Sequence, residues 1–300
     1  MWQPEPGWQR LPGGTSPSAY GVWLAREGER DVVVKRLLAP VEGDPPEISD
    51  WRSAAWWERE PQVALHALVT ATPGLRGPRM LRVDEDDEGI TMVQERVAET
   101  DNPGLFVARA LGRFAGSTPP DEPWLARGQL RERLSRVERR GGWQTLARTT
   151  MADVADHLWR QRGRHLDALD AAPQVLQHGD PTPENLRGRV GDDVVAIDWS
   201  SLGTGAVGHD LGLWALASRE AFEPLLAAYV DGLADADLAP AAAAGARITV
   251  VYTALSRLDW ALRRVAEGEG ALAGKYSHPS VAPYVHSMQR QAAQIEALLS

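Results

Sequence analysis

The stretch that decides the fold reads His178-Gly179-Asp180-Pro181-Thr182-Pro183-Glu184-Asn185. It is a proline-rich loop between two short apolar runs, 175–176 and 194–197, each of which is expected to form a short strand. Asp180 and Asn185 lie five residues apart on this loop, and Asp198 directly follows the second apolar run. We therefore expect these three polar side chains to turn toward one cleft.

Together, these three side chains can bind a metal ion and accept a proton. Two aspartates and an asparagine supply one base and two oxygen ligands for a hard divalent cation, and Mg2+ prefers oxygen ligands together with phosphate oxygens. Phosphoryl transfer asks little covalent chemistry of a protein, because it depends on an aligned nucleophile, a grip on the phosphates and neutralisation of charge. The loop therefore indicates Mg2+-dependent phosphoryl transfer.

A second block of residues extends the pattern. Gly203-Thr204-Gly205 and Gly208-His209-Asp210-Leu211 follow the loop. In order and spacing, the whole block resembles the signature of aminoglycoside phosphotransferase-type small-molecule kinases. The resemblance spans roughly residues 11 to 265 by the order of its motifs, and it is closest from 175 to 211.

The resemblance implies a role for each polar residue of the block. Asp180 is expected to be the catalytic base, and Asn185 and Asp198 are expected to be the metal ligands. His178 and Asp210 are expected to hold the catalytic loop in place. We interpret His178 as a hydrogen-bonded structural residue, because the aspartate two residues later suits the role of base better than a histidine.

Lysine is rare in this chain, which draws attention to Lys35. Only Lys35 and Lys275 are lysines among the 32 basic residues. Lys35 follows the run 32–34 of three valines and resembles the strand lysine that contacts the α and β phosphates in kinase-like folds. The resemblance implies a carboxylate partner on the next helix, which by position is Glu60, with Glu58 as the alternative.

The segment from Leu11 to Gly21 resembles the glycine-rich cover over the phosphates of such kinases, although it lacks a regular Gly-x-Gly-x-x-Gly pattern. Backbone amides from Ser16 to Ala19, including that of Ser18, are expected to bind phosphate. Because the loop is irregular, ATP and GTP both stay open as the nucleotide.

The run 92–97 stands where such kinases keep the hinge between their lobes, and the resemblance implies that backbone groups of Gln94 and Arg96 pair with adenine. Only twelve residues separate Asp198 from Asp210, and no Ala-Pro-Glu segment follows. This spacing leaves no room for the long activation loop of a protein kinase. A small-molecule acceptor is therefore favoured over a protein.

The hydrophobic patterns and the resemblance indicate the same fold class, α+β with a protein-kinase-like, two-lobe arrangement. Residues 1–98 are predicted to form a small strand-rich, nucleotide-binding lobe. Residues 99–300 are predicted to form a larger helical lobe that carries the catalytic loop and the acceptor site.

The expected elements follow from periodicity and from turn residues. A helix within 51–68 is expected to begin near Glu60, with Pro61 in its first turn. Strands are expected at 20–38, interrupted by a turn at 27–30, and at 79–84 and 89–97. Further helices are predicted at 105–116, 125–140, 150–169, 211–234, 240–266 and 283–299.

Composition limits the partners and the setting of the protein. A net charge of -9 and a pI near 5.3 argue against nucleic acid as a partner and suit a cationic acceptor. The absence of cysteine excludes disulfides and thiolate metal sites, and it agrees with a reducing cytoplasm. Residues 1–12 show no signal segment and no run is apolar over about 18 residues, so we expect a cytoplasmic protein without a membrane segment.

Two features of the helical region concern the acceptor. Asp259, Trp260 and the loop 267–269 are candidates for the wall of an acceptor pocket. The arginine-rich run 131–140 is interpreted as the solvated face of a helix.

The leading hypothesis is an ATP-dependent O-phosphotransferase that moves the γ-phosphate to a hydroxyl of a small molecule. The expected acceptor is an aminoglycoside or another cationic antibiotic, which would make the protein an antibiotic resistance enzyme. A metabolic kinase for choline, homoserine, a sugar or a fructosamine is the alternative, because the same loop serves them all. A nucleotide-binding module without catalysis would be expected to lack Asp180 or Asp198, and both are present. The oligomeric state is not predicted.

Overall fold

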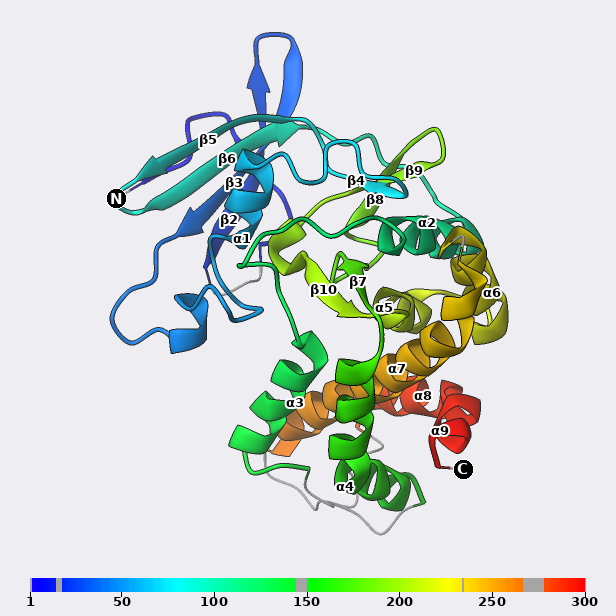
Figure 1. Ribbon diagram of the computed structural model, residues 1–300. Helices are drawn as coiled ribbons and strands as arrows, with labels where there is room; N and C mark the ends of the chain where they lie inside the picture. Colours follow the sequence, from blue (N-terminus) through cyan, green and yellow to red (C-terminus); the bar gives the residue numbers. More distant parts are fainter. Residues whose placement is uncertain (1, 15–17, 144–149, 234, 267–277, 300) are drawn as a thin grey trace.

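The computed structural model describes residues 2–14, 18–143, 150–233, 235–266 and 278–299. A twisted sheet with one helix beside it forms the smaller part of the molecule, and helices form the larger part (Figure 1). The predicted α+β, kinase-like architecture is confirmed.

The smaller part is built on an antiparallel sheet in the order β1-β2-β3-β6-β5. Its strands are β1 (Gln9–Arg10), β2 (Ala19–Glu27), β3 (Arg30–Leu38), β5 (Met80–Asp86) and β6 (Gly89–Glu95). In β3, Val32 and Val34 are buried on one face, and Lys35 shares the other face with Leu37. Lys35 pairs with β2 on one side and β6 on the other, so it lies inside the sheet.

Helix α1 (Arg59–Leu65) is much shorter than the helical stretch expected over 51–68. Pro61 lies in its first turn, as predicted. Proline is tolerated there because the backbone N–H that it lacks would have no acceptor within the helix. Residues 51–58 form turns instead of helix. The reason is the Arg59 side chain, whose guanidinium binds the carbonyl groups of Trp51, Ser53 and Ala54 and stabilises these turns.

The larger part contains helices whose bounds differ from the prediction in three places. The helix expected at 125–140 begins only after Gly128, which has a φ of 59°. The stretch 211–234 breaks at Ser218, which is extended, and 283–299 breaks at Gln291. The helices are α2 (Gly104–Ala115), α3 (Gln129–Arg139), α4 (Thr150–Ala171), α5 (His209–Ala217), α6 (Phe222–Leu233), α7 (Ala239–Ala266), α8 (Ala282–Arg290) and α9 (Ala292–Leu299).

Two small sheets carry the loop 178–185, which the sequence predicts to be the catalytic loop. Strand β7 (Gln174–Gln177) pairs antiparallel with β10 (Gly203–Ala206), and β8 (Leu186–Val190) pairs antiparallel with β9 (Asp193–Ala196). The loop 178–185 connects β7 to β8, so both of its ends are anchored in sheets.

Strand β4 (Leu75–Arg76) joins the two parts of the molecule, because it pairs in parallel with β9 although it precedes residue 98. Strands β4, β8 and β10 were missed by the sequence prediction. Strand β4 has only two residues, and β8 and β10 combine glycine with arginine or threonine, as in Gly203-Thr204-Gly205 of β10. No apolar alternation therefore marks these strands in the sequence.

Helix α7 passes through the centre of the larger part (Figure 1). In the described part of the chain, 236–265 is a helix long and apolar enough to cross a membrane by length and composition, contrary to the sequence expectation. Of its most apolar window, 61% is buried inside the protein, and Val250, Ala254 and Leu258 are core residues. The apolar character of α7 is therefore accounted for by its place in the core.

Candidate active site

Asp210, in the first turn of α5, anchors the start of the predicted catalytic loop by hydrogen bonds to its backbone. Its carboxylate accepts hydrogen bonds from the backbone amides of His178, at 2.7 Å, and Gly179, at 2.9 Å. Burial raises the pKa of Asp210 to about 7, although both amides act in the opposite direction. Gly179 has a φ of 84°, and a Cβ there would lie 2.5 Å from the carbonyl oxygen of Ser201. Only glycine therefore fits this turn.

His178 links the loop to the residue before Asp198. Its Nε2 donates to the carbonyl oxygen of Ile197 at 3.0 Å, and its Nδ1 accepts from the backbone amide of Asp180 at 3.3 Å. This pattern requires a neutral ring with its proton on Nε2. Burial lowers the pKa of His178 and keeps it in that form. The geometry agrees with a structural role for His178.

Asn185 orients Asp180. Its Nδ2 donates to the backbone oxygen of Asp180 at 3.0 Å and to Oδ2 of the same residue at 3.1 Å. The Asn185 carbonyl oxygen accepts from the amide of Ile197 at 2.8 Å, which places Asn185 beside the residue that precedes Asp198. Oδ1 of Asn185 has no hydrogen-bond partner among the described residues, so it is available as a ligand.

Lys35 joins the sheet to α1 through Glu60 and to the larger part of the molecule through Asp198. Its Nζ lies 2.5 Å from Oε2 of Glu60 and 3.0 Å from Oδ1 of Asp198. Partial burial would raise the pKa of Asp198, but Lys35, Ser200 and His178 hold it below its usual range. Burial raises the pKa of Glu60. The prediction that Glu60, and not Glu58, would be the partner of Lys35 agrees with this geometry.

Asp198 adopts an unusual backbone conformation. Its φ of 59° and ψ of 65° lie in the left-handed region, which costs a residue with a side chain on the order of 1–3 kcal/mol. Such strain persists where the surroundings hold it, and here the Lys35 ion pair and the Ile197 hydrogen bonds do so. The turn directs the carboxylate toward Lys35.

The site suits a hard divalent cation by the chemistry of its donors. Asn185 and Asp198 offer oxygen ligands, and the two carboxylates around Lys35 exceed its single positive charge. The described residues contain no group of three or more His, Cys, Asp or Glu side chains that could hold a metal alone. Mg2+ commonly takes one or two protein ligands and completes its shell with phosphate oxygens and water.

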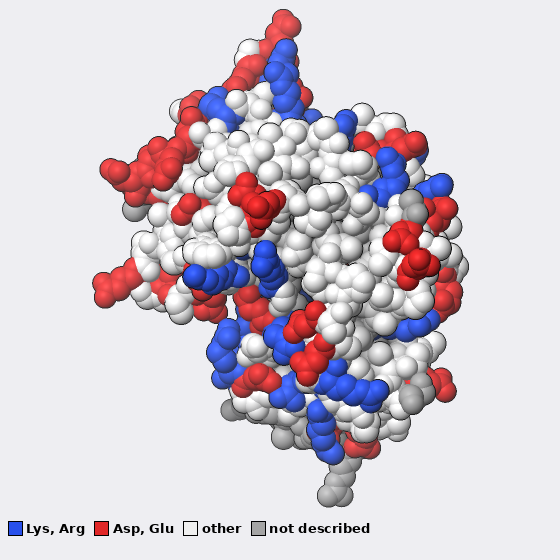
Figure 2. Space-filling model, in the orientation of Figure 1, with Lys and Arg blue, Asp and Glu red and all other residues white. Residues whose placement is uncertain are grey.

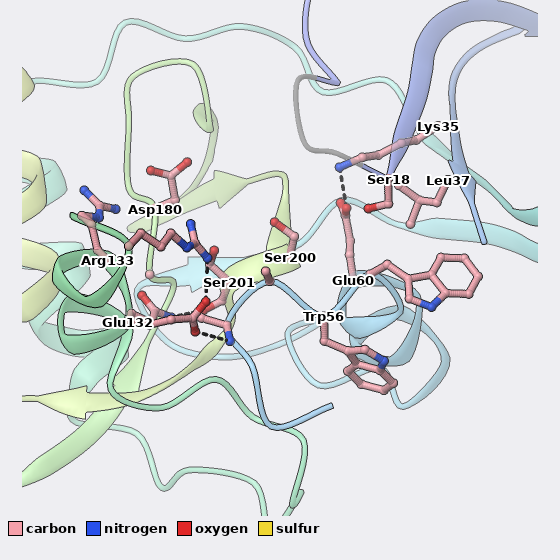
Figure 3. A pocket seen from close by; sticks show the side chains of 16 residues that line it. Ser18, Lys35, Leu37, Trp56, Glu60, Glu132, Arg133, Asp180, Ser200 and Ser201 are labelled. Carbon is pink, nitrogen blue, oxygen red and sulfur yellow. Dashed lines mark hydrogen bonds and ion pairs between the residues drawn. The ribbon is translucent and has the colours of Figure 1, made fainter. Parts of the chain in front are cut away.

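A cavity of about 300 Å³ opens between Lys35 and Asp180 (Figure 3), and the predicted metal ligands Asn185 and Asp198 are not among the residues that line it. Ser18, Lys35 and Glu60 lie on one side of it, and Asp180 and Arg133 lie on the other. The turns at 54–57 and helix α3 complete the wall with Ala54, Ala55, Trp56, Trp57, Gln129, Glu132 and Arg136.

The remaining predicted nucleotide contacts are placed differently. Ser16 lies outside the described residues, whereas Ser18 lines the cavity. Gln94 lies inside β6, paired with both neighbouring strands, and lines a small cavity behind Glu60. Arg96 forms a surface ion pair with Asp31 at 3.0 Å. The cavity that contains Lys35 and Asp180 therefore does not include Gln94 or Arg96.

Sequence reasoning missed three residues of this site. Arg59 is fully buried and binds five carbonyl oxygens, including those of Trp124 at 3.0 Å and Ser200 at 3.2 Å, so it ties the turns at 51–54 to the larger part. Glu132 accepts from the amide of Ala54 at 2.8 Å. Arg133 lies near Asp180. The interpretation of 131–140 as a solvated face was wrong on this side of α3, and Leu130 and Leu134 were the signal that the helix is amphipathic.

Comparison with known proteins agrees with this geometry. The sequence profile of the phosphotransferase enzyme family matches residues 7–248. The chain belongs to the phosphotransferase enzyme family. A search among curated proteins returned no match. The recognised resemblance is confirmed, and with it the expectation of a phosphotransferase that acts on hydroxyl groups of small molecules.

Solved structures of kinases share the fold of this family member at low sequence identity. A choline/ethanolamine kinase family protein from Mesorhizobium loti has a TM-score of 0.59 at 20% identity, covering 97% of this chain and 92% of that one. The GDP complex of aminoglycoside 2'-phosphotransferase-IIIa has a TM-score of 0.60 at 13% identity, with coverage of 92% and 94%. Amicoumacin kinase hAmiN, in complex with AMP-PNP and Ca2+, has a TM-score of 0.57 at 11% identity, with coverage of 97% and 88%.

Proposed function

We propose that this protein is an ATP-dependent, Mg2+-dependent O-phosphotransferase in which Asp180 is the catalytic base. The observation that carries the proposal is the position of Asp180, which Asn185 orients at 3.1 Å on the side of the cavity opposite Lys35. A hydroxyl between them would meet a proton acceptor on one side and the phosphates of a nucleotide on the other.

The reaction then needs one proton transfer and one bond exchange. Asp180 accepts the proton of the acceptor hydroxyl as its oxygen bonds to the γ-phosphorus. The bond between the γ-phosphorus and the β–γ bridging oxygen breaks, and the nucleoside diphosphate leaves with that oxygen. Lys35, fixed by Glu60 and Asp198, holds phosphate oxygens during the exchange.

The nucleotide and the metal complete the proposal. Asn185 and Asp198 would hold Mg2+, which when bound neutralises charge on the phosphates. We propose that the backbone near Ser18 contacts the phosphates, and that the backbone of Gln94 and Arg96 contacts the base. One structural neighbour was solved with AMP-PNP and Ca2+ and another with GDP, which supports a nucleotide and a divalent cation as ligands. A binding competition between ATP and GTP would show which nucleotide this protein prefers. We place the enzyme in the cytoplasm, where ATP is supplied.

Two acceptor classes follow from the family. The first is an aminoglycoside or another cationic antibiotic, with a role in resistance, and neighbours that bind kanamycin or amicoumacin support it. The second is a metabolite such as choline, homoserine, a sugar or a fructosamine. On the wall beside Asp180, Arg136 is paired with Glu132, and the positive charge of Arg133 favours acceptors of the second class that are not cations. A binding module without catalysis gives no role to the Asp180 carboxylate that Asn185 orients.

The decisive experiment replaces the base. Asp180→Asn should lower turnover by about 10³-fold, because a general base typically contributes 10² to 10⁴-fold, and should leave nucleotide affinity within about twofold. Labelled ATP is incubated with a panel of antibiotics and metabolites, and nucleotide binding is measured by calorimetry. Asp87→Asn, on the exposed turn between β5 and β6, is the matched control. Turnover retained by the Asp180 variant would refute the assignment.

A further inference from the structure

A second cavity of about 470 Å³ lies next to the cavity beside Asp180, between α3, α7 and α8. The two cavities share Arg133 and Arg136. The second is also lined by Val137, Arg140, Ser256, Arg257, Trp260 and Tyr284. Basic side chains gather around the hollow between the two parts of the molecule and over the helices below it (Figure 2). A molecule whose hydroxyl lies at Asp180 would extend along this basic wall.

Apart from Asp180, the carboxylates that α3 and α7 place at or beside this wall, Glu132 and Asp259, are already neutralised by other partners. Glu132 accepts from the amide of Ala54 and from Arg136, at 2.8 and 2.6 Å. Asp259 is bound through both oxygens by Arg263, at 3.0 and 2.9 Å, and it lies 4.0 Å from Arg140. Neither carboxylate is left to balance a further cation.

Arg133 and Arg257 are the cations that remain. Among the described residues, neither guanidinium has an ion-pair or hydrogen-bond partner, although both side chains are half-buried. Burial lowers the pKa of Arg133 to about 10, and Arg257 adds to this effect because the two positive charges are close to each other, while Asp180 opposes it. Two like charges held together away from full solvation are unfavourable unless an anion joins them.

We propose that the acceptor carries an oxyanion, a carboxylate or a phosphate group, which Arg133 and Arg257 bind while the hydroxyl lies at Asp180. This inference rests on the proposed phosphotransferase function and deepens it. Guanidinium groups suit the task because they bind such oxyanions through paired N–H donors. Trp260 and Tyr284 would pack against the carbon skeleton of the acceptor. The predicted pocket residue Trp260 thus lines the wall, whereas the loop 267–269 lies outside the described residues.

The first experiment compares matched acceptors with the full-length protein, ATP and Mg2+. Hydroxy acids and sugar acids are compared with their amides or parent sugars, hydroxylated phosphate monoesters with the free alcohols, and choline and kanamycin represent cations. We expect the kcat/KM of an anionic acceptor to exceed that of its neutral counterpart by at least about tenfold, as for a hydrogen bond to a charged group. The comparison of carboxylic acids with phosphate monoesters shows which of the two oxyanions the protein recognises. Equal or greater activity with neutral or cationic acceptors would overturn the inference.

The second experiment tests the two arginines with the best anionic acceptor of that panel. Arg133→Met and Arg257→Met should each raise the acceptor KM by at least about tenfold and leave the KM for ATP within about twofold. Arg133→Lys and Arg257→Lys keep the charge and should recover part of the loss. Arg164→Met, on the exposed face of α4, is the control.

Charge reversal separates this inference from the proposed function. Arg257→Glu should reduce activity with anions and increase it with choline or kanamycin. A rise in the KM for ATP in place of the acceptor KM would mean that the arginines hold nucleotide phosphate, and would overturn the inference while the phosphotransferase stands. Absence of any Asp180-dependent transfer, to any acceptor of the panel, would overturn the proposed function itself.

Discussion

The two walls of the cleft carry charge in opposite ways. On the wall made by β3, α1 and Asp198, one lysine faces two carboxylates, and every charge has a partner within 3.0 Å. On the wall made by α3 and α7, Arg133 and Arg257 have no partner among the described residues. A paired wall is rigid before a ligand arrives, whereas an unpaired wall gains an interaction only when an anion binds.

The difference in net charge also assigns the walls to different ligands. The lysine wall is net negative, which suits a divalent cation that carries nucleotide phosphates. The arginine wall is net positive, which suits an anionic acceptor and disfavours an aminoglycoside or choline. The overall charge of -9 does not reveal this, because the relevant charges are local.

Among the changes that compare the two walls, the largest expected effect concerns the paired wall. Lys35→Met should lower kcat/KM for the nucleotide by about 10²-fold whatever the acceptor, because it removes a fixed donor to phosphate and leaves Glu60 and Asp198 unbalanced. Steady-state kinetics at varied ATP measure the effect. Arg26→Met, exposed on the same sheet, should have no effect. A Lys35 variant that loses affinity only for the acceptor would reverse the assignment of the walls.

The next effect is on stability, because Arg59 ties the turns at 51–54 to the larger part of the molecule. Arg59→Met should lower the free energy of unfolding by about 3 kcal/mol, since it leaves several buried carbonyl groups without a donor. Urea denaturation followed by fluorescence measures this. Arg52→Met, in the same turns but exposed, is the control and should change stability by less than about 0.5 kcal/mol. Equal stability of the two variants would contradict the role of Arg59.

A pH-dependent effect on stability reports the environment of the arginine wall. Burial, and then the nearby charge of Arg133, lower the pKa of His209 from 6.5 to about 3. The unfolded chain therefore binds a proton below pH 6.5 that the folded protein does not bind until about pH 3. The stability that neutral His209 contributes is fully present above pH 6.5 and is lost as the pH falls toward 3, by about 1.4 kcal/mol per unit.

This pH effect is measured as a difference between two proteins. Asp210, with a pKa of about 7, has the opposite dependence, because its protonated folded form contributes stability that is lost as the pH rises from 3.8 toward 7. Comparison of wild type with His209→Gln removes the Asp210 contribution, since both proteins contain it. The stability lost by the variant should shrink as the pH is lowered from 6.5 to 4. A constant difference would mean that His209 titrates normally.

The smallest effect tests whether the hinge acts through its backbone. Arg96→Ala breaks an exposed ion pair with Asp31 and should change stability by less than about 1 kcal/mol. The KM for ATP should stay within about twofold, because the proposed contact to the base uses the main chain. A large rise in that KM, with unchanged stability, would show that the side chain binds the nucleotide.

Much of the site could be predicted because its residues are close in sequence or have a distinctive setting. The loop from His178 to Asn185 was recognisable as a unit, and Lys35 stood out in a chain with two lysines. Strands β4, β8 and β10 could not be predicted, because their residues have little β propensity and their pairing comes from partners elsewhere in the chain. Arg59 and Arg133 could not be told from surface arginines among the thirty in the chain.

The sequence by itself determined the family, the two-part α+β architecture and the order of the catalytic groups, because these depend on local patterns and on spacing along the chain. Only the tertiary structure decided which carboxylate pairs with Lys35, which arginines reach the cleft, and which of them form no ion pair with any described residue. Burial and pairing depend on contacts among α3, α7 and the turns at 51–57, which are far apart in the sequence. No local sequence pattern predicts such contacts.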